Sequence, residues 1–374
     1  MNTHGAMPQL NTRTDKPCHG TPIKKWPWPF RQILTMVAHL YDNRVYHWIV
    51  SIPLAPLDTV FGLFYTVLNA IWPIRYWREW QDIPEPKFPL PREADDIPVQ
   101  PEACDACGKY LTSMVGLHVN ADRLAALLPP GLTLDPDRIH KGKHPLVLIF
   151  GYTQDLRRIW WPLPGMSYLE FLVGIPNIML VDKEGNPEHK FEFRFFYIPL
   201  LHLNRFYPTL IGWLVGYRKR WSRVTATENS YTVKTLFLGR HILHAEFGTK
   251  PVPPELAAVA SRDTERWSKL LNQPNVNPFG DTNLFLHFHW DWADAKQKIE
   301  PITATVTVYQ DLPGLPPGKY DISRMDVTHF IDVEAPPAGG VRFCSPFELL
   351  PPFSKKLLER HQQKIKALAE KTNA

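Results

Sequence analysis

The run Thr225–Phe247, TATENSYTVKTLFLGRHILHAEF, decides the fold class of this chain. Threonine, tyrosine, valine and isoleucine favour strands, and they are frequent in the stretches Thr225–Val233, Lys234–Leu238 and His241–Phe247. Gly239-Arg240, between the last two stretches, is typical of a hairpin turn. The run therefore predicts three successive antiparallel strands.

Similar short apolar stretches flank this run on both sides, with turn residues between them. The further predicted strands are Tyr110–Val119, Pro145–Tyr152, Tyr168–Leu180, Lys190–Ile198, Asn283–Trp292, Thr303–Tyr309 and Met325–Val333, with a hairpin turn at Lys183–Asn186. Helices are expected at Ala121–Leu128, where Asn120 is the predicted N-cap, and at Pro254–Leu271. The 38 prolines are spread along the whole chain and argue against long helices. The pattern predicts a mainly β (α+β) domain with an antiparallel sheet.

Composition divides the 374 residues into five parts. They are a polar, disordered tail at 1–25, an apolar helical segment at 26–80, a proline-rich linker at 81–104, the β domain at 105–353 and a C-terminal helix at 354–374. The stripe of the last helix consists of Leu357, Leu358, Ile365 and Leu368. The chain is long enough for one domain of about 250 residues with extensions at both ends.

The apolar segment 26–80 allows three interpretations. Its cleanest helical piece, Val60–Trp72, is shorter than the roughly 20 residues that span a bilayer. Aromatic and basic residues follow it, which favours an interfacial or re-entrant membrane anchor. A longer transmembrane helix over Tyr46–Trp72 is the second interpretation, although Asp58 would be costly in lipid. The third is a helical pair packed on the main domain or on another subunit.

Charge and cysteine usage exclude several classes of protein. The formal net charge of +5 is too small, and too dispersed, to indicate nucleic-acid binding. Four cysteines do not form a disulfide framework in a chain of this length. The first apolar run follows a polar stretch with Lys24 and Lys25, so no secretory signal is expected. These features predict a cytoplasmic protein, with membrane association through residues 26–80 left open.

Metal binding is not predicted. Cys104 and Cys107 form a lone C-x-x-C pair, and no second pair follows at the spacing of a zinc site. His287 and His289 would share one face of a strand with Asp291, but no further ligand is evident. No Gly-rich phosphate loop or dinucleotide fingerprint occurs. We expect no cofactor, because a lysine that forms a Schiff base would itself supply the electron sink.

Two short motifs carry the chemistry. Tyr217-Arg218-Lys219-Arg220 places a lysine between two guanidinium groups inside an apolar run. Burial and like charge both lower a lysine pKa, and a neutral amine can attack a carbonyl carbon. Tyr168-Leu169-Glu170 places a carboxylate between apolar residues, where burial would raise its pKa and suit it to acid–base work. Together the motifs predict Schiff-base chemistry, whereas a solvated basic run is the plain alternative for residues 218–223.

These motifs resemble those of the acetoacetate decarboxylase superfamily over about residues 105–353. Tyr168-Leu169-Glu170 matches the family's Tyr-x-Glu, and Gly216–Arg220 is similar to its Gly/Ala-Tyr-Pro-Lys-Lys motif. His118–Leu124 with the following Leu127–Leu132, together with Leu312-Pro313 and Cys344–Pro351, resembles further family segments. The chain departs from the family at Arg218, at Arg220 and at Ile211-Gly212-Trp213, which stands where the family has Gly-Arg-Glu. A family arginine near the domain start has no clear match.

The resemblance implies a sheet curved into a cone or barrel around an apolar cavity. It implies Lys219 as the Schiff-base nucleophile, Glu170 as proton shuttle and Arg220 as the group that keeps Lys219 neutral. Arg205, Tyr168, Tyr217 and Trp213 are the candidate substrate-binding residues. An ordinary loop role for Arg205 remains the alternative.

The predicted function is that of a lyase that acts on a keto acid by decarboxylation or aldolase-like C–C chemistry. The alternative is a non-catalytic protein that binds an apolar ligand on the same fold and is anchored to a membrane by residues 26–80. A third interpretation makes residues 33–74 an oligomer interface, and a homo-oligomer is expected.

Overall fold

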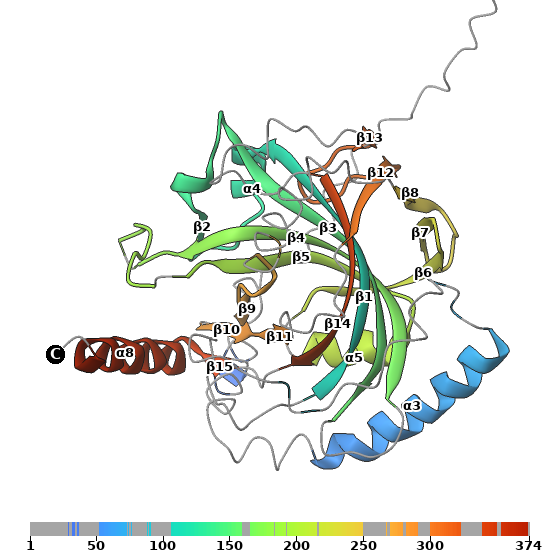
Figure 1. The fold of residues 1–374 in the computed structure, drawn as a ribbon, viewed down its shortest axis with the longest axis horizontal. Helices are drawn as coiled ribbons and strands as arrows, with labels where there is room; N and C mark the ends of the chain where they lie inside the picture. Colours follow the sequence, from blue (N-terminus) through green and yellow to red (C-terminus); the bar gives the residue numbers. More distant parts are fainter. Residues whose placement is uncertain are drawn as a thin grey trace, which may run out of the picture.

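The fold is built around a closed barrel of nine strands (Figure 1). The computed structural model describes residues 52–72, 106–158, 165–182, 184–191, 193–214, 217–249, 270–279, 282–290, 300–322, 339–349 and 353–372, with residues 29, 32, 33, 36, 74, 76, 88, 90 and 267. The predicted tail 1–25, most of the linker 81–104, Cys104, Asp291, the strand at Met325–Val333 and most of the helix at Pro254–Leu271 lie outside these residues.

The helices and strands run as follows. They are α3 (Ile52–Ile71), β1 (Ala106–Asn120), α4 (Ala121–Ala125), β2 (Leu132–Leu134), the 3-10 turn η4 (Pro136–Arg138), β3 (Lys143–Arg157), β4 (Met166–Leu180), β5 (Phe195–Leu203), α5 (Phe206–Leu214), β6 (Lys219–Thr227), β7 (Ser230–Thr235), β8 (His241–Thr249), β9 (Asn275–Phe279), β10 (Thr282–Leu286), β11 (Phe288–Trp290), β12 (Glu300–Val308), β13 (Gly318–Asp321), β14 (Gly339–Leu349), β15 (Phe353–Ser354) and α8 (Lys355–Thr372).

The barrel closes in the order β1-β3-β4-β5-β6-β7-β8-β12-β14 and back to β1. All of these pairs are antiparallel except β5–β6, which is parallel over Leu201–Leu203 and Lys219–Trp221. Parallel strands cannot be joined by a hairpin, and α5 forms the crossover connection between β5 and β6. The prediction of a mainly β barrel is confirmed, with this one parallel seam as a difference.

The barrel wall is buried on both of its faces along β4. Alternate residues point to opposite sides of a strand, so Phe171 and Val173 belong to one apolar cluster, and Tyr168 and Leu172 belong to another. The inner cluster contains residues from all nine strands and therefore fills the barrel interior, where the Phe150 ring packs 5.2 Å from Phe171 and from Phe247 (centroid distances). The outer cluster lies between the barrel wall and the segments around α3, α5, β10 and β11.

Several predicted boundaries differ from the observed ones. The strand expected at Lys190–Ile198 is β5, Phe195–Leu203, and the strand expected at Thr225–Val233 is divided by a turn at residues 228–229. Leu238 lies in the β7–β8 turn, where Gly239 has φ +60°. The strand expected at Asn283–Trp292 is broken at His287, so the predicted histidine pair does not share one regular strand. Among the described residues no metal-ligand cluster occurs.

Helix α3 begins eight residues before the predicted start at Val60. Pro53 lies in its first turn, where backbone N–H groups have no helical partner anyway. Pro56 lies inside the helix and cannot donate to the carbonyl of Ile52, but the helix continues past it. Within the described part of the chain, no helix is long and apolar enough to cross a membrane.

The described parts of the N-terminal segment are packed on the barrel. Tyr76 belongs to the inner cluster, and its hydroxyl lies 3.0 Å from the Phe150 carbonyl oxygen and 3.2 Å from Ser113 Oγ. The backbone N–H of Leu90 donates to Glu348 at 2.7 Å. At the other end, α8 projects from the barrel, and salt bridges from Lys355 to Glu188 and from Lys190 to Glu359 (2.7 Å) hold its first turns (Figure 1).

Candidate active site

Lys219 is the first residue of β6 and follows the crossover helix α5. Its Nζ donates to the carbonyl oxygen of Pro208 in α5 at 3.2 Å and lies 5.7 Å from the centre of the Tyr217 ring. Lys219 as a whole keeps part of its surface exposed. The site is therefore formed where the only parallel seam of the barrel meets its crossover.

Gly212 leaves the space through which the lysine side chain passes. A Cβ atom at this position would collide with the Cδ and Cε atoms of Lys219. Gly212 lies in α5, so the helix and the lysine are in direct contact at this point. Gly212 is the second residue of Ile211-Gly212-Trp213, the triplet that departs from the family's Gly-Arg-Glu, and it thus has a steric reason here.

Burial lowers the pKa of Lys219 to about 8, while the Glu170 carboxylate acts in the opposite direction. At pH 7 a group with this pKa is roughly a tenth neutral, about 300-fold more than an ordinary lysine. An amine with this pKa has enough neutral form at pH 7 to attack a carbonyl carbon.

Glu170 lies in β4 on the same side of the barrel wall as Lys219. It is opposite Leu203, and Lys219 is opposite Leu201, so both side chains point toward the outer cluster. Burial raises the pKa of the Glu170 carboxyl, whereas the Lys219 cation and a hydrogen bond from Tyr110 oppose the rise. A carboxyl with a raised pKa that interacts electrostatically with an amine can pass a proton to and from a reacting group.

Tyr110 was not among the predicted site residues. It lies in β1, two strands from Glu170, with Gly151 of β3 between them. A Cβ atom at Gly151 would collide with the Tyr110 hydroxyl, so the glycine lets the phenol cross β3 and reach the carboxyl. The Tyr231 hydroxyl donates to the Glu170 carbonyl oxygen at 2.7 Å and so holds the backbone of β4 in place at this residue. No sequence motif indicated this arrangement, because it depends on strand register.

Arg220 points away from Lys219. Consecutive residues of a strand face opposite sides, and the partner of Arg220 across the seam is His202, which stacks on Phe171 of the inner cluster. Burial lowers the pKa of His202 to about 3, and Arg220 adds to this shift. Burial alone is the cause that lowers the pKa of Lys219, so the predicted repulsion by Arg220 is not what the structure shows.

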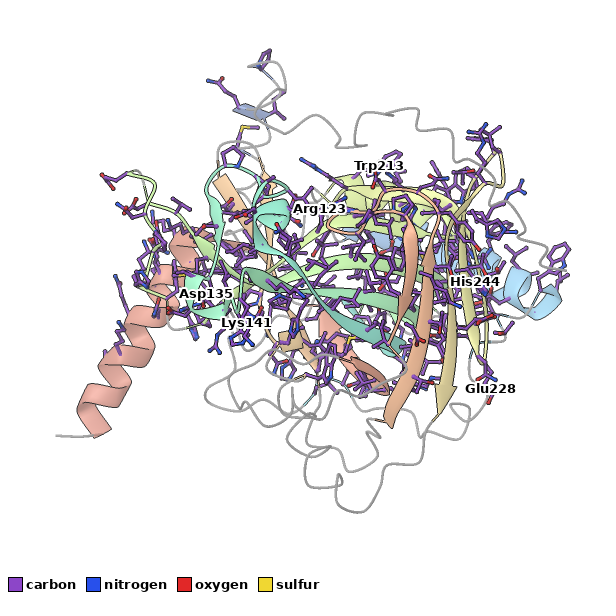
Figure 2. The ribbon with its side chains drawn as sticks, turned by 90° about the horizontal axis from the view of Figure 1, so that it is seen from above. Arg123, Asp135, Lys141, Trp213, Glu228 and His244 are labelled. Carbon is purple, nitrogen blue, oxygen red and sulfur yellow. The ribbon has the colours of Figure 1, made fainter. Side chains whose placement is uncertain are left out.

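The other predicted residues divide into two groups. Tyr168 and Tyr217 are buried in the outer cluster next to Glu170 and Lys219. Trp213 is 52% exposed at the periphery of the molecule, where its Nε1 donates to the Lys219 carbonyl oxygen at 2.6 Å (Figure 2). Arg205 turns to α3, with one guanidinium nitrogen 2.6 Å from Asn69 Oδ1 and its plane over the Tyr65 ring.

The geometry can be compared with known proteins. No protein-family model and no curated protein matches the chain. Among solved structures, acetoacetate decarboxylase from Legionella pneumophila has 14% identity and a TM-score of 0.42, covering 72% of this chain and 92% of its own. An acetoacetate decarboxylase-like enzyme from Sphingomonas wittichii has 12% identity and a TM-score of 0.42 over 73% and 98%.

A third similar structure is the enduracididine biosynthesis enzyme MppR in complex with the condensation product of pyruvate and imidazole 4-carboxaldehyde. It has 16% identity and a TM-score of 0.39, covering 66% of this chain and 87% of its own. The first two of these structures are named for acetoacetate decarboxylase, the family whose motifs the sequence resembles. Sequence identities and TM-scores this low do not allow an activity to be transferred. The function must therefore be inferred from the chemistry of the chain's own residues.

Proposed function

We propose that the chain is an acetoacetate decarboxylase-like lyase that forms a Schiff base between Lys219 and the carbonyl group of a keto acid. One observation carries the proposal: the half-buried Lys219, whose pKa burial lowers to about 8, faces the outer cluster from the same side of the wall as the half-buried Glu170. An amine in such surroundings is reactive at neutral pH, and the carboxyl supplies the proton that dehydration requires.

The steps balance without a cofactor. The Lys219 amine adds to the ketone carbon, and the carbinolamine loses water after Glu170 gives a proton to the departing hydroxyl. The resulting iminium accepts the electron pair of the C–C bond as CO2 leaves from a β-carboxylate. Protonation of the enamine carbon and hydrolysis then release the ketone and the free lysine. The same iminium would accept electrons in an aldolase-like C–C cleavage.

Borohydride trapping tests this proposal. Reduction in the presence of acetoacetate should attach the substrate carbon skeleton to the peptide that contains Lys219, and mass spectrometry locates the adduct. Lys219→Met should abolish trapping, while the exposed Lys319→Met is the matched control. Absence of an adduct across several β-keto acids would instead favour a non-catalytic protein that binds an apolar ligand.

We further propose that α3 rests on a lipid surface. Its outward side carries Leu57, Val60, Leu63, Phe64, Val67 and Ile71, all more than 45% exposed, followed by Trp72 at 70%. Asp58, the only charged residue of this helix, is turned inward, where it accepts from the Tyr207 hydroxyl at 2.6 Å and pairs with Arg158 at 3.1 Å. An uncharged apolar stripe next to the basic and aromatic sequence Arg75–Arg78 suits an anionic membrane interface.

Vesicle sedimentation tests the lipid contact. The protein should bind vesicles that contain phosphatidylserine, and the double variant Val60→Gln with Val67→Gln should remain in the supernatant. Replacing Thr66, also exposed but polar, with Gln is the control. Loss of a dimer in the double variant, without any vesicle binding by the parent, would identify the surface as an interface between two copies of this chain.

A further inference from the structure

The turn between β7 and β8 holds two large apolar side chains in water. Phe237 and Leu238 are 86% and 71% exposed, the highest values for a large apolar side chain among the described residues. The turn is ordered, because the Thr235 N–H donates to the Arg240 carbonyl oxygen at 2.8 Å and the Arg240 N–H donates to Thr235 Oγ1 at 3.0 Å. Hairpin turns ordinarily carry small or polar residues, so this pair calls for an apolar environment outside the barrel.

Exposed aromatic side chains continue from this turn along the start of β6 to α5. Trp221 lies beside the base of the turn, because β6 pairs with β7 from the next residue onward. Its ring packs 5.3 Å from that of Phe206, and the two side chains are 42% and 41% exposed. In Figure 2 the exposed Trp213 of α5 lies across the molecule from Glu228, which belongs to the polar β6–β7 turn. The apolar edge of the barrel consists of Phe206, Trp213, Trp221, Phe237 and Leu238.

A row of basic side chains crosses three strands at the base of the same turn. Arg223 of β6 is opposite Lys234 of β7, which is opposite His241 of β8. The Arg223 guanidinium extends toward the turn, since a Cβ atom added at Gly239 would lie 3.7 Å from one of its nitrogens. Like charges directly opposite one another in a sheet are destabilising. The row therefore favours an anion from outside the chain.

The sequence around the apolar edge contains no acidic residue. Segments 205–227 and 230–245 contain five and two lysines and arginines, and no aspartate or glutamate. A protein partner of mixed charge is matched by charges of both signs, whereas an anionic bilayer is matched by cations alone. Tryptophan also prefers the boundary between acyl chains and lipid headgroups. Charge and composition together favour a lipid surface as the occupant of this edge.

We propose that the apolar edge docks on an anionic bilayer, with Phe237 and Leu238 among the upper acyl chains and the basic row at the level of the lipid phosphates. The docking needs no Schiff base, so it is independent of the chemistry at Lys219. It adds a second lipid contact, on other elements, to the one proposed for α3. Because β6 carries both Lys219 and Trp221, docking brings the amine site close to the bilayer surface.

Vesicle sedimentation at two lipid compositions tests the docking. The full chain should bind vesicles of phosphatidylcholine with phosphatidylserine, and should bind vesicles of phosphatidylcholine alone much more weakly. Phe237→Ser with Leu238→Ser should weaken binding at least about tenfold, because it removes the apolar side chains that lipid buries. Phe237→Trp should bind like the parent, since tryptophan suits the same boundary. Ile139→Ser, which changes an exposed apolar side chain at the end of η4, is the matched control.

Charge variants test the contact with lipid phosphates. Arg223→Gln with Arg240→Gln should weaken binding to the phosphatidylserine vesicles about 25-fold, since each cation near an anionic surface contributes about fivefold. Lys319→Gln with Lys366→Gln removes the same charge from exposed positions elsewhere and should have little effect. The changed side chains are all exposed, so no variant should alter the melting temperature. Equal losses in the two charge variants would show that net charge alone attracts the lipid and would overturn the proposal.

The two lipid contacts fail in different ways. If Val60→Gln with Val67→Gln abolishes vesicle binding and Phe237→Ser with Leu238→Ser leaves it unchanged, α3 is the contact and the apolar edge is not. A parent protein that binds neither kind of vesicle overturns both. If the Phe237 and Leu238 changes then dissociate a dimer, the edge is an interface between two copies of this chain. Loss of vesicle binding with borohydride trapping at Lys219 retained supports the docking separately from the Schiff-base function.

Discussion

At the residue scale, Lys219 destabilises the fold, because burial disfavours the charged form of its amine. Its pKa is about 8 in the folded chain and 10.5 when solvated, so between these values the unfolded chain binds more protons. The free energy of unfolding therefore rises with pH across this window, and the penalty is fully present below pH 8. The cost at pH 7 is about 2 kcal/mol once partial exposure is considered.

Lys219→Met should consequently be inactive but more stable at pH 7, by about 2 kcal/mol. Urea unfolding at pH 7 and at pH 10.5 measures the gain, which should shrink at the higher value as the parent protein loses its penalty. Lys319→Met should change neither quantity, because that side chain is exposed. A variant that is less stable than the parent at pH 7 would contradict the buried amine.

Tyr110 sets the proton affinity of Glu170. The hydrogen bond from its phenol opposes the rise that burial causes in the Glu170 pKa. Tyr110→Phe removes that bond, so the pKa of Glu170 should rise further, and the acid limb of kcat/KM against pH should move to higher pH. Tyr197→Phe, another buried phenol, serves as the control. If the acid limb of kcat/KM does not move, protonation of Glu170 does not control the rate.

The amine and the carboxyl were predictable from sequence, but their partners were not. Lys219 and Glu170 lie in motifs that can be recognised from the sequence alone. Tyr110 reaches Glu170 only because Gly151 lies between them in the register of three strands. The role predicted for Arg220 depended on proximity in sequence, and the alternation of β6 places it on the opposite side of the wall.

At the scale of elements, the contact between α5 and β6 holds the amine in position. Gly212→Ala would place a methyl group against the lysine side chain. Alanine is the better helix former by about 1 kcal/mol, so the helix itself should not suffer. We expect activity to fall more than tenfold while the helical circular dichroism persists.

The pH profile distinguishes this displacement from a general defect. A lysine pushed toward water regains its ordinary affinity for protons, so the basic limb of kcat/KM should move upward from about pH 8. Gly318→Ala is the control, because the nearest atom to its added Cβ is 3.7 Å away. Unchanged kinetics in Gly212→Ala would mean that the Lys219 side chain does not pass next to Gly212.

Lys219 begins a strand that was not among those predicted from the sequence. The run from Arg218 to Arg223 is basic and lacks the apolar alternation of a half-buried strand. It pairs nevertheless, because β5 presents a free edge to which the crossover delivers it. Tertiary context overrides local preference at this point, as is common for strands.

At the scale of the whole molecule, described residues on either side of residue 80 contact the barrel. Tyr76 packs edge-on against Tyr231 at 5.6 Å in the barrel interior, and Leu90 is hydrogen-bonded to Glu348. The division into a helical segment at 26–80 and a domain from 105 was drawn from composition, which does not reveal such contacts.

Truncation should therefore have two different results. Deleting residues 1–50 keeps both contacts and should leave the melting temperature nearly unchanged. Deleting residues 1–100 removes them and should destabilise the barrel strongly. Tyr76→Ala in the full chain should account for about 3–5 kcal/mol of that loss in urea unfolding. Equal stability of the two truncated proteins would show that the segment is dispensable.

The parallel seam joins only three residue pairs, and the first of them includes the residue that carries the amine. Opening of the barrel at this seam would bring that nitrogen into water and restore its ordinary basicity. Reactivity of the amine toward an acylating reagent at mildly alkaline pH would thus report whether the barrel is closed between β5 and β6. The reactive group is in this way also a chemical probe of barrel closure.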